Sequence, residues 1–297
     1  MATTLRILYA FVFAAVAIEY VFLPYAFTAR GLSPADIGLL FTGRTLVVVL
    51  LQPKLSELAD RLQRHHSILK IAVCAQFLGA AALGFAPEFW SIAAVIWAQA
   101  CFRAPIVPVI DSTTVRAVGP ARYGNIRLWG SLGFGVCAAL VGRLASDLNY
   151  DLAGELSLSL YIAVTAVGAL SALALPHERR KPVERTEGPR GLYSRAFVVF
   201  IAWNSLHWMA IAAYNTFFSL HTKDLALSAD VPGDAMGVAI LGEALAFYLA
   251  PRLFSRSGAA PWVLGSLAIS ALRWWLTATV SDPGWLVLLQ GLHFFTF

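Results

Sequence analysis

Six charged residues lie within long apolar runs of this sequence, where a charge is costly. A charge at the centre of a bilayer costs about 2.5–3.5 kcal/mol on insertion scales. Such charges are therefore expected to pair with one another, or to bind a solute or a proton along a water-filled path. The six are Glu19, Arg44, Arg103, Asp111, Glu243 and Arg273, and two histidines, His207 and His293, also lie in apolar runs.

The depth of these charges along their runs predicts which of them can meet. At about 1.5 Å of rise per helical residue, Glu19 and Arg44 come within about 5 Å of each other in depth on adjacent antiparallel helices. The same reasoning brings Glu243 near Arg273. Each pair is interpreted either as a structural ion pair or as part of a solute and proton path. The role of Arg103 stays open.

His207 lies in a polar and aromatic stretch that begins at Trp203. A buried histidine is more often a hydrogen-bonded core residue than a proton carrier. Because the ordinary pKa of histidine is near 6.5, proton transfer by His207 is kept as the second interpretation.

No residue pattern typical of an enzyme or an ATP-driven pump is present. The sequence has no His-Glu-x-x-His, Gly-x-Ser-x-Gly, Walker or Cys-x-x-Cys motif. Its three cysteines fall inside apolar runs, so they predict no disulfide framework. We expect no catalytic residue, no metal ion and no cofactor. An intramembrane enzyme or a channel is a remote alternative.

The composition shows what kind of fold must position these charges. Of the 297 residues, 59% are hydrophobic and 13% are charged, whereas soluble domains have about 45–50% and about 25%. A soluble fold could not cover its surface with so few charges, and such high hydrophobicity excludes a disordered chain. The sequence therefore predicts an all-α, multi-pass integral membrane protein whose surroundings are the lipid bilayer.

Ten apolar segments are predicted to enter the membrane as helices, since about 20 apolar residues span the hydrocarbon layer. They divide into a six-helix bundle over residues 1–175, a basic cytoplasmic linker over 176–194, and an incomplete bundle over 195–297. Pro105 and Pro108 predict a bend in the fourth span. The spans are 5–27, 35–53, 68–86, 89–115, 124–144, 156–175, 195–220, 235–253, 262–280 and a tenth that begins at 285.

The basic residues predict the orientation of the chain. Most of the 22 Lys and Arg residues fall on the side of the N-terminus, whereas the loop over 147–155 on the other side is acidic. The positive-inside rule then places the N-terminus in the cytoplasm. The net charge of +5 comes mainly from these loops, so it does not indicate a nucleic-acid partner.

A weak repeat relates the two bundles. A Gly-x4-Gly pattern from Gly38 ends at Arg44, and the same pattern from Gly237 ends at Glu243, each shortly after a Pro-x-Asp turn. Two halves of six helices related in parallel are a known plan of transporters.

Several motifs occur together in this chain. A signature around spans 4 and 5 contains Asp111, Tyr123-Gly124, Arg127 and Trp129-Gly130. Further motifs are Phe22-Leu23-Pro24, Arg273-Trp274, and the run that begins with Gln290 and includes His293. The set resembles the phenylpropionate permease-like branch of the major facilitator superfamily, which is related to nucleoside–proton and oligosaccharide–proton symporters. The loop after the second span keeps Asp60, Arg61 and Arg64 of the superfamily motif, with Ser56 and Gln63 where glycines are usual.

The resemblance implies a major facilitator-type bundle that takes up a small organic solute with protons by alternating access, in a bacterial inner membrane. Arg44 and Arg273 favour an aromatic or other organic acid as the solute, because a guanidinium group binds a carboxylate through two parallel hydrogen bonds. The expected solute and proton path is formed by Glu19, Arg44, His207, Glu243, Arg273, Gln290 and His293. The expected structural and gating residues are Asp60, Arg61, Arg64, Asp111, Arg127 and Trp129.

Two departures from the family keep alternatives open. Glu19 occupies a position where the branch is not associated with an acid, so the solute preference can differ. The family has twelve helices and this chain stops as the tenth begins, so we expect a C-terminal truncation. A non-transporting fragment and a nucleoside or sugar symporter are the alternatives, and the oligomeric state is left open.

Overall fold

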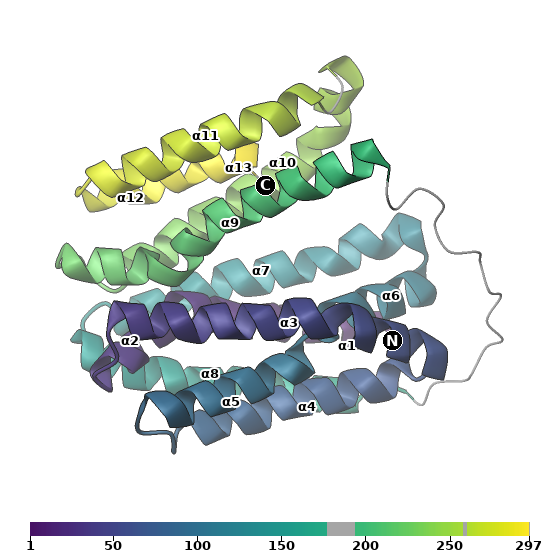
Figure 1. Ribbon diagram of the computed structural model, residues 1–297, viewed down its shortest axis with the longest axis horizontal. Helices are drawn as coiled ribbons and strands as arrows, with labels where there is room; N and C mark the ends of the chain where they lie inside the picture. Colours follow the sequence, from purple (N-terminus) through teal and green to yellow (C-terminus); the bar gives the residue numbers. More distant parts are fainter. Residues whose placement is uncertain (177–193, 258–259, 297) are drawn as a thin grey trace.

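A computed structural model describes residues 1–176, 194–257 and 260–296, which fold as helices without a strand. The helices run back and forth along the long direction of the molecule (Figure 1). We name the two ends of the bundle after residues there: the Met1 end and the Gly31 end. The elements are α1 (Ala2–Val21), α2 (Leu23–Ala29), α3 (Pro34–Leu62), α4 (His65–Leu83), α5 (Phe89–Arg103), α6 (Ile106–Val118), α7 (Pro120–Ala145), α8 (Tyr150–Leu173), α9 (Arg195–Asp224), α10 (Val231–Ser257), α11 (Ala260–Thr279), α12 (Pro283–Leu289), the 3-10 turn η1 (Gln290–Leu292) and α13 (His293–Thr296).

The predicted spans correspond to these helices, and proline accounts for two breaks. The first span divides into α1 and α2 at Phe22, just before Pro24, and the fourth divides into α5 and α6 around Pro105. Proline removes a backbone donor and crowds the preceding turn, so the predicted bend in the fourth span is confirmed. The tenth span begins as α12, η1 and α13. Residues 177–193 of the predicted linker 176–194 lie outside the described residues.

The start of α3 is encoded locally. The Ser33 hydroxyl accepts a hydrogen bond from the Asp36 N–H at 3.2 Å, and the Asp36 carboxylate accepts one from the Ser33 N–H at 2.9 Å. This reciprocal capping box satisfies two amides that the first helical turn leaves free. The predicted end of this span at Pro53 is wrong for the helix, because α3 continues through Pro53 to Leu62. The run of apolar residues ends at Pro53, so it predicted only the first part of α3.

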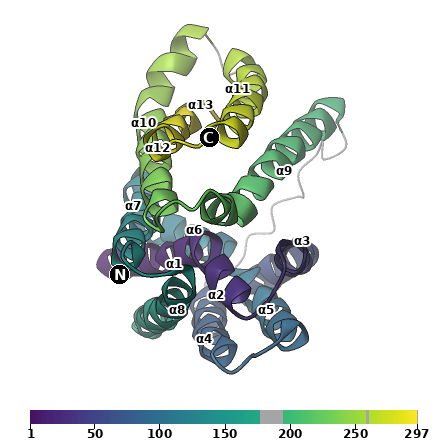
Figure 2. The ribbon, with the colours of Figure 1, turned by 90° about the vertical axis from the view of Figure 1, so that its left-hand side faces the viewer.

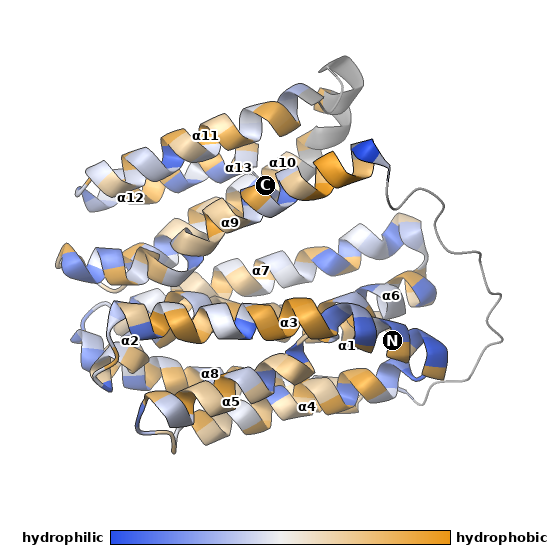
Figure 3. Cartoon of the chain, in the orientation of Figure 1, coloured by the Kyte–Doolittle hydropathy of each residue, from blue (hydrophilic) through white to orange (hydrophobic). Residues whose placement is uncertain are grey.

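Among the described residues, seven helices are long and apolar enough to cross a membrane, with α5 and α6 counted together as one. Large apolar side chains face outward along them, and on α3 Leu50 is 66% exposed and Val49 is 62% exposed. Figure 3 shows apolar residues along the lengths of the helices and hydrophilic residues near several helix ends. Exposed apolar surface of this extent needs a lipid environment, which agrees with a multi-pass membrane protein.

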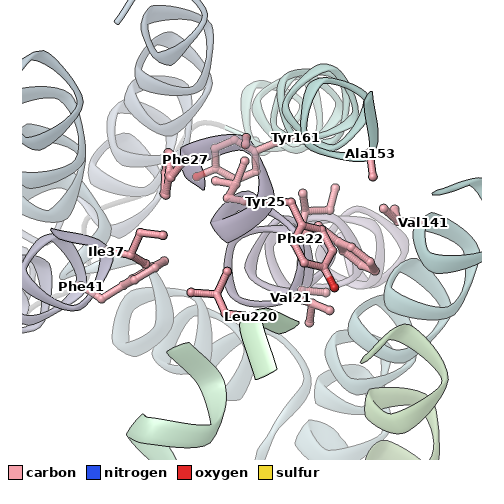
Figure 4. Packing of buried hydrophobic residues seen from close by; sticks show 14 of the residues in the cluster. Val21, Phe22, Tyr25, Phe27, Ile37, Phe41, Val141, Ala153, Tyr161 and Leu220 are labelled. Carbon is pink, nitrogen blue, oxygen red and sulfur yellow. The ribbon is translucent and has the colours of Figure 1, made fainter. Parts of the chain in front are cut away.

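The helices form two groups, α1–α8 and α9–α13, and Figure 2 shows the second group above the first. Within the first group α1 packs closely on α7. A Cβ atom on Gly133 would lie only 2.2 Å from the Ala10 carbonyl oxygen, so the missing side chain permits this approach. A buried cluster that includes Phe22, Tyr25 and Tyr161 also takes in Leu220 of α9, and Figure 4 shows this packing.

The two groups meet at the Gly31 end. Lys223 Nζ donates to Thr28 Oγ1 at 3.0 Å, and Arg143 lies 3.3 Å from Asp234. There α10 crosses α7 closely, since a Cβ on Gly233 would lie 2.4 Å from the Ala138 carbonyl oxygen. We call these contacts the Gly31-end seal. Toward the Met1 end, α9 and α11 diverge from α3 and α7 (Figure 1).

Candidate functional site

Two adjoining cavities lie between the helix groups. Cavity A has a volume of about 310 Å³ and is lined by α1, α7, α9, α10, α11 and α13. Cavity B has a volume of about 540 Å³ and is lined by α1, α3 and α9. Both are lined by Tyr20, Trp208 and Asn215, so a solute in one cavity lies beside the other.

Cavity A brings together charges from both helix groups. Arg127 comes from α7, Glu243 from α10 and Arg273 from α11, and His293 of α13 also lines the wall. Of the residues predicted for the solute and proton path, Glu243, Arg273 and His293 therefore share one cavity. The roles of these residues in transport stay predictions.

Arg273 is held by neutral partners. Its Nε and Nη2 atoms donate to Gln290 Oε1 at 2.9 and 2.6 Å, and its Nη1 atom lies 3.0 Å from His293 Nδ1. Its guanidinium lies 4.4 Å from the ring centre of Trp274 and 4.9 Å from that of Tyr214. Arg273 is only 1% exposed, and no carboxylate of the described residues forms an ion pair with it.

Glu243 points toward α7. Its Oε1 atom accepts a hydrogen bond from Ser131 Oγ at 2.8 Å, and the residue is 6% exposed. The predicted pairing of Glu243 with Arg273 is wrong. Gln290 offers Arg273 an acceptor for two of its nitrogen atoms, which turns the guanidinium toward η1 and α13, while Ser131 draws the carboxylate to the other group of helices. The depth argument placed both residues at one cavity but could not rank competing partners.

Glu19 forms the centre of a second charge cluster. Arg44 Nη1 donates to its Oε1 atom and Arg103 Nη1 donates to its Oε2 atom, which ties α1 to α3 and α5. The predicted Glu19–Arg44 pair is confirmed. Arg103, whose role the sequence left open, is the second partner of Glu19. The sequence feature that pointed to it was a charge within an apolar run for which no acidic partner was predicted.

Arg44 is enclosed on several sides. Its Nη2 atom donates to the Tyr20 hydroxyl at 2.9 Å, and its guanidinium lies 4.7 Å from the ring centres of both Tyr20 and Phe41. The residue is 6% exposed and lines cavity B. Cation–π contacts of this kind stabilise a desolvated guanidinium.

Asp111 and Arg127, expected as structural and gating residues, are linked through Tyr9 and not by a direct contact. The Tyr9 hydroxyl donates to Asp111 Oδ1 at 2.6 Å. Arg127 lies 4.2 Å from the ring centre of Phe13 and 5.8 Å from that of Tyr9. Because Arg127 also lines cavity A, it belongs to the candidate site as well. Trp129, on the same helix, is 43% exposed.

The other predicted residues lie away from the cavity linings. His207 precedes Trp208, and its Nδ1 atom is buried without a hydrogen-bond partner in the described part of the chain. At the Met1 end, Asp60 accepts from Arg116 at 3.1 Å and lies 2.9 Å from His65. Near them, Arg61 pairs with Glu57 at 2.5 Å and Arg64 is the N-cap of α4.

The sequence reasoning missed the uncharged walls of the cavities. Tyr20, Trp208, Tyr214 and Asn215 line one or both of them. A weak signal was available, since Tyr20 is adjacent to Glu19 and Trp208 is adjacent to His207. Aromatic residues are so common in membrane helices, however, that adjacency to a charge does not single them out.

Comparison with known proteins gives consistent matches. The sequence model of the MFS_1 like family matches residues 2–297. The chain is 28% identical to the "Probable 3-phenylpropionic acid transporter" of Escherichia coli (strain K12), over 90% of this chain and 71% of that protein. It is 27% identical to the "Uncharacterized transporter YwbF" of Bacillus subtilis (strain 168), over 90% and 68%. A crystal structure of a mutant nucleoside transporter, NupG, superposes with a TM-score of 0.83 at 19% identity, covering 100% of this chain and 79% of that one.

Proposed function

Because this chain belongs to the MFS_1 like family of major facilitator transporters, we propose that it carries an organic acid across the membrane together with protons. It is a transporter and not an enzyme, and its solute is a small molecule. The proposal concerns the chemical class of that solute, the coupling ion and the orientation, with the N-terminus in the cytoplasm of a bacterial inner membrane.

The observation that carries the proposal is the surroundings of Arg273. A buried guanidinium with neutral partners retains its full charge, and a carboxylate is the ligand that it binds best. Arg127 lines the same cavity and adds a second positive charge. A relative of this chain is named as a probable 3-phenylpropionic acid transporter, and aromatic walls at Tyr214 and Trp208 suit the ring of such an acid.

Glu243 is the proposed proton carrier. It is a buried carboxylate that accepts a hydrogen bond from the Ser131 hydroxyl, and a proton would remove the cost of burying its charge. When Glu243 is neutral, cavity A presents guanidinium groups and attracts an anion. When it is ionised, it repels the anion, so proton and solute binding favour each other by linkage.

Alternating access is the proposed transport cycle. The Gly31-end seal closes one side of the two cavities, and the helix groups diverge toward the Met1 end. With the N-terminus in the cytoplasm, this arrangement is the inward-open form. Rocking of one helix group against the other would open the Gly31 end.

Transport of a nucleoside or a sugar is the second candidate. Cavity B is lined by the hydroxyl or amide groups of Thr42, Thr45, Asn215 and Thr216 beside aromatic rings, which suits a neutral solute with several hydroxyl groups.

Ligand binding to the purified chain in detergent tests both candidates. We expect 3-phenylpropionate to bind, with uridine and maltose binding at least tenfold more weakly. Calorimetry in buffers of different ionisation enthalpy should show proton uptake upon binding of the acid, and affinity should rise as the pH is lowered.

Substitution of Glu243 tests its role. Glu243→Gln should keep binding of the acid and lose both the proton uptake and the pH dependence, whereas Glu57→Gln, at an exposed side chain of α3, should change neither. Undiminished proton uptake by Glu243→Gln would contradict the assignment. Binding of uridine or maltose without binding of the acid would favour the second candidate.

A further inference from the structure

We infer that Glu19 sets the charge selectivity of the site: it occupies Arg44, so that a carboxylate of the solute that reaches cavity B finds no free guanidinium there and monoanions are selected over dianions. This inference rests on the proposed function. It assigns to Glu19 a positioning role that acts through Arg44, without contact between Glu19 and the solute.

Glu19 has no free carboxylate oxygen, and Arg44 is already paired with it. One oxygen accepts from Arg44 and the other from Arg103. Arg44 also donates to Tyr20 and lies against two aromatic rings. A carboxylate of a solute would have to displace the internal carboxylate, which is only 7% exposed. The Glu19 carboxylate is part of the chain and already oriented, whereas a solute carboxylate loses translational freedom when it binds. Glu19 is therefore the favoured partner of Arg44.

Arg273 presents the opposite case. Its acceptors are an amide oxygen, an imidazole nitrogen and the Thr296 hydroxyl. These groups orient the guanidinium but do not cancel its charge. A solute carboxylate at Arg273 therefore meets no competing internal carboxylate in the described part of the chain.

The two arginines line adjoining cavities, A and B, which share Tyr20, Trp208 and Asn215. A solute whose carboxylate binds at Arg273 extends its other end toward cavity B. If that end carries a second carboxylate, it loses its hydration and finds Arg44 already paired with Glu19. An unpaired charge in such a place is strongly unfavourable, and rejection of a competing ligand by this means is a common basis of specificity.

A double substitution isolates this effect from total charge. The cluster of Glu19, Arg44 and Arg103 has one carboxylate and two guanidinium groups. Glu19→Gln combined with Arg103→Gln keeps the same net charge but frees Arg44. Arg103→Gln alone changes the net charge and leaves Arg44 paired with Glu19, so it is the matched control.

Two ligands with the same skeleton report the selectivity. The monoanion is 3-phenylpropionate, and the dianion is 3-(4-carboxyphenyl)propanoate, which has its second carboxylate at the far end of the ring. We expect the wild-type chain to bind the monoanion at least about tenfold more tightly. The double variant should reduce this ratio by about tenfold or more, as expected for one new charge-assisted hydrogen bond. Arg103→Gln should keep the wild-type ratio.

Glu19→Asp provides a second route if the double variant does not fold. The aspartate keeps the negative charge, but its shorter side chain cannot hold both guanidinium groups, so the ratio should fall between those of the wild type and the double variant. An unchanged ratio in every folded Glu19 variant would overturn the inference while the proposed function stands. Absence of binding of 3-phenylpropionate to the wild-type chain would overturn the proposed function, and the inference with it.

Discussion

Glu19 and Glu243 are chemically identical and similarly buried, yet their surroundings give them different chemistry. Glu19 accepts from two guanidinium groups, so a proton would have to replace two ion pairs. Glu243 accepts from a serine hydroxyl, so a proton there replaces no ion pair. A carboxylate that exchanges protons during a transport cycle needs the second kind of environment, which is why we assign proton transfer to Glu243.

Arg273→Lys should weaken binding of 3-phenylpropionate by about tenfold or more, since hydrogen bonds to charged groups contribute about 1.5–3 kcal/mol. Lysine keeps the charge but lacks the planar fork that binds Gln290 and a carboxylate together. Titration calorimetry measures the change. Arg61→Lys, at an exposed ion pair of the Met1 end, is the control. Equal affinity of wild type and Arg273→Lys would contradict the placement of the solute.

Residue types and depth predicted the positions of the buried charges but not all of their partners. Glu19 and Arg44 lie on adjacent antiparallel helices, so equal depth was sufficient to pair them. Glu243 and Arg273 also line one cavity, but Ser131 is a better placed donor for Glu243 and Gln290 a better placed acceptor for Arg273. Which polar side chain binds a buried charge depends on how each helix is rotated about its axis. A single sequence does not give that rotation.

At the scale of the elements, glycine decides how closely α7 approaches its neighbours. Gly133 faces the backbone of α1 at Ala10, and the backbone of α7 at Ala138 faces Gly233 of α10. One helix thus has a close backbone contact within its own group and another across the two groups. Small residues at such contacts let membrane helices pack closely.

Gly133→Ala should destabilise the protein by about 1–3 kcal/mol, the usual cost of overpacking a close contact. The added Cβ would lie 2.2 Å from a backbone oxygen, which cannot rotate away. A lower melting temperature in detergent would report the loss. Gly124→Ala on the same helix, where a Cβ meets nothing within 4 Å, should leave it unchanged. Equal melting temperatures for both variants would contradict the role given to Gly133.

The helices themselves were predictable where apolarity and helical structure coincide. The spans that became α5 to α8 follow from runs of apolar residues and from Pro105. The part of α3 after Pro53 was missed because its polar residues, Lys54 to Arg61, end the apolar run but continue the helix. Hydropathy predicts what lies in lipid, and backbone hydrogen bonding determines where a helix stops.

At the scale of the whole molecule, the two helix groups are joined at the Gly31 end and diverge toward the Met1 end. Contacts such as Lys223 with Thr28 and Arg143 with Asp234 are small and polar. Exposed ion pairs contribute about 0–1 kcal/mol each. The seal also includes the close α7–α10 packing at Gly233, so opening the Gly31 end has to separate packed helices as well as these polar contacts. The sequence predicted two bundles but could not predict which end is closed.

Cross-linking the Gly31-end seal should leave solute binding intact. Ser228 Oγ lies 3.3 Å from the Ser146 carbonyl oxygen, so cysteines at these two positions can be joined by a short bifunctional thiol reagent, with Cys74, Cys101 and Cys137 replaced by serine. We expect the same dissociation constant for 3-phenylpropionate before and after linking, because the cavities are reached from the Met1 end. Loss of binding after linking would contradict this access route.

The cluster around Glu19 also has a consequence for biogenesis. The ribosome makes Glu19 first, Arg44 comes 25 residues later, and Arg103 follows 84 residues after Glu19. The first helix therefore leaves the ribosome with an acid whose counter-charges have not yet been synthesised. Since an unpaired charge opposes insertion into lipid, we expect α1 to insert more readily together with α3, as a helical hairpin, than alone.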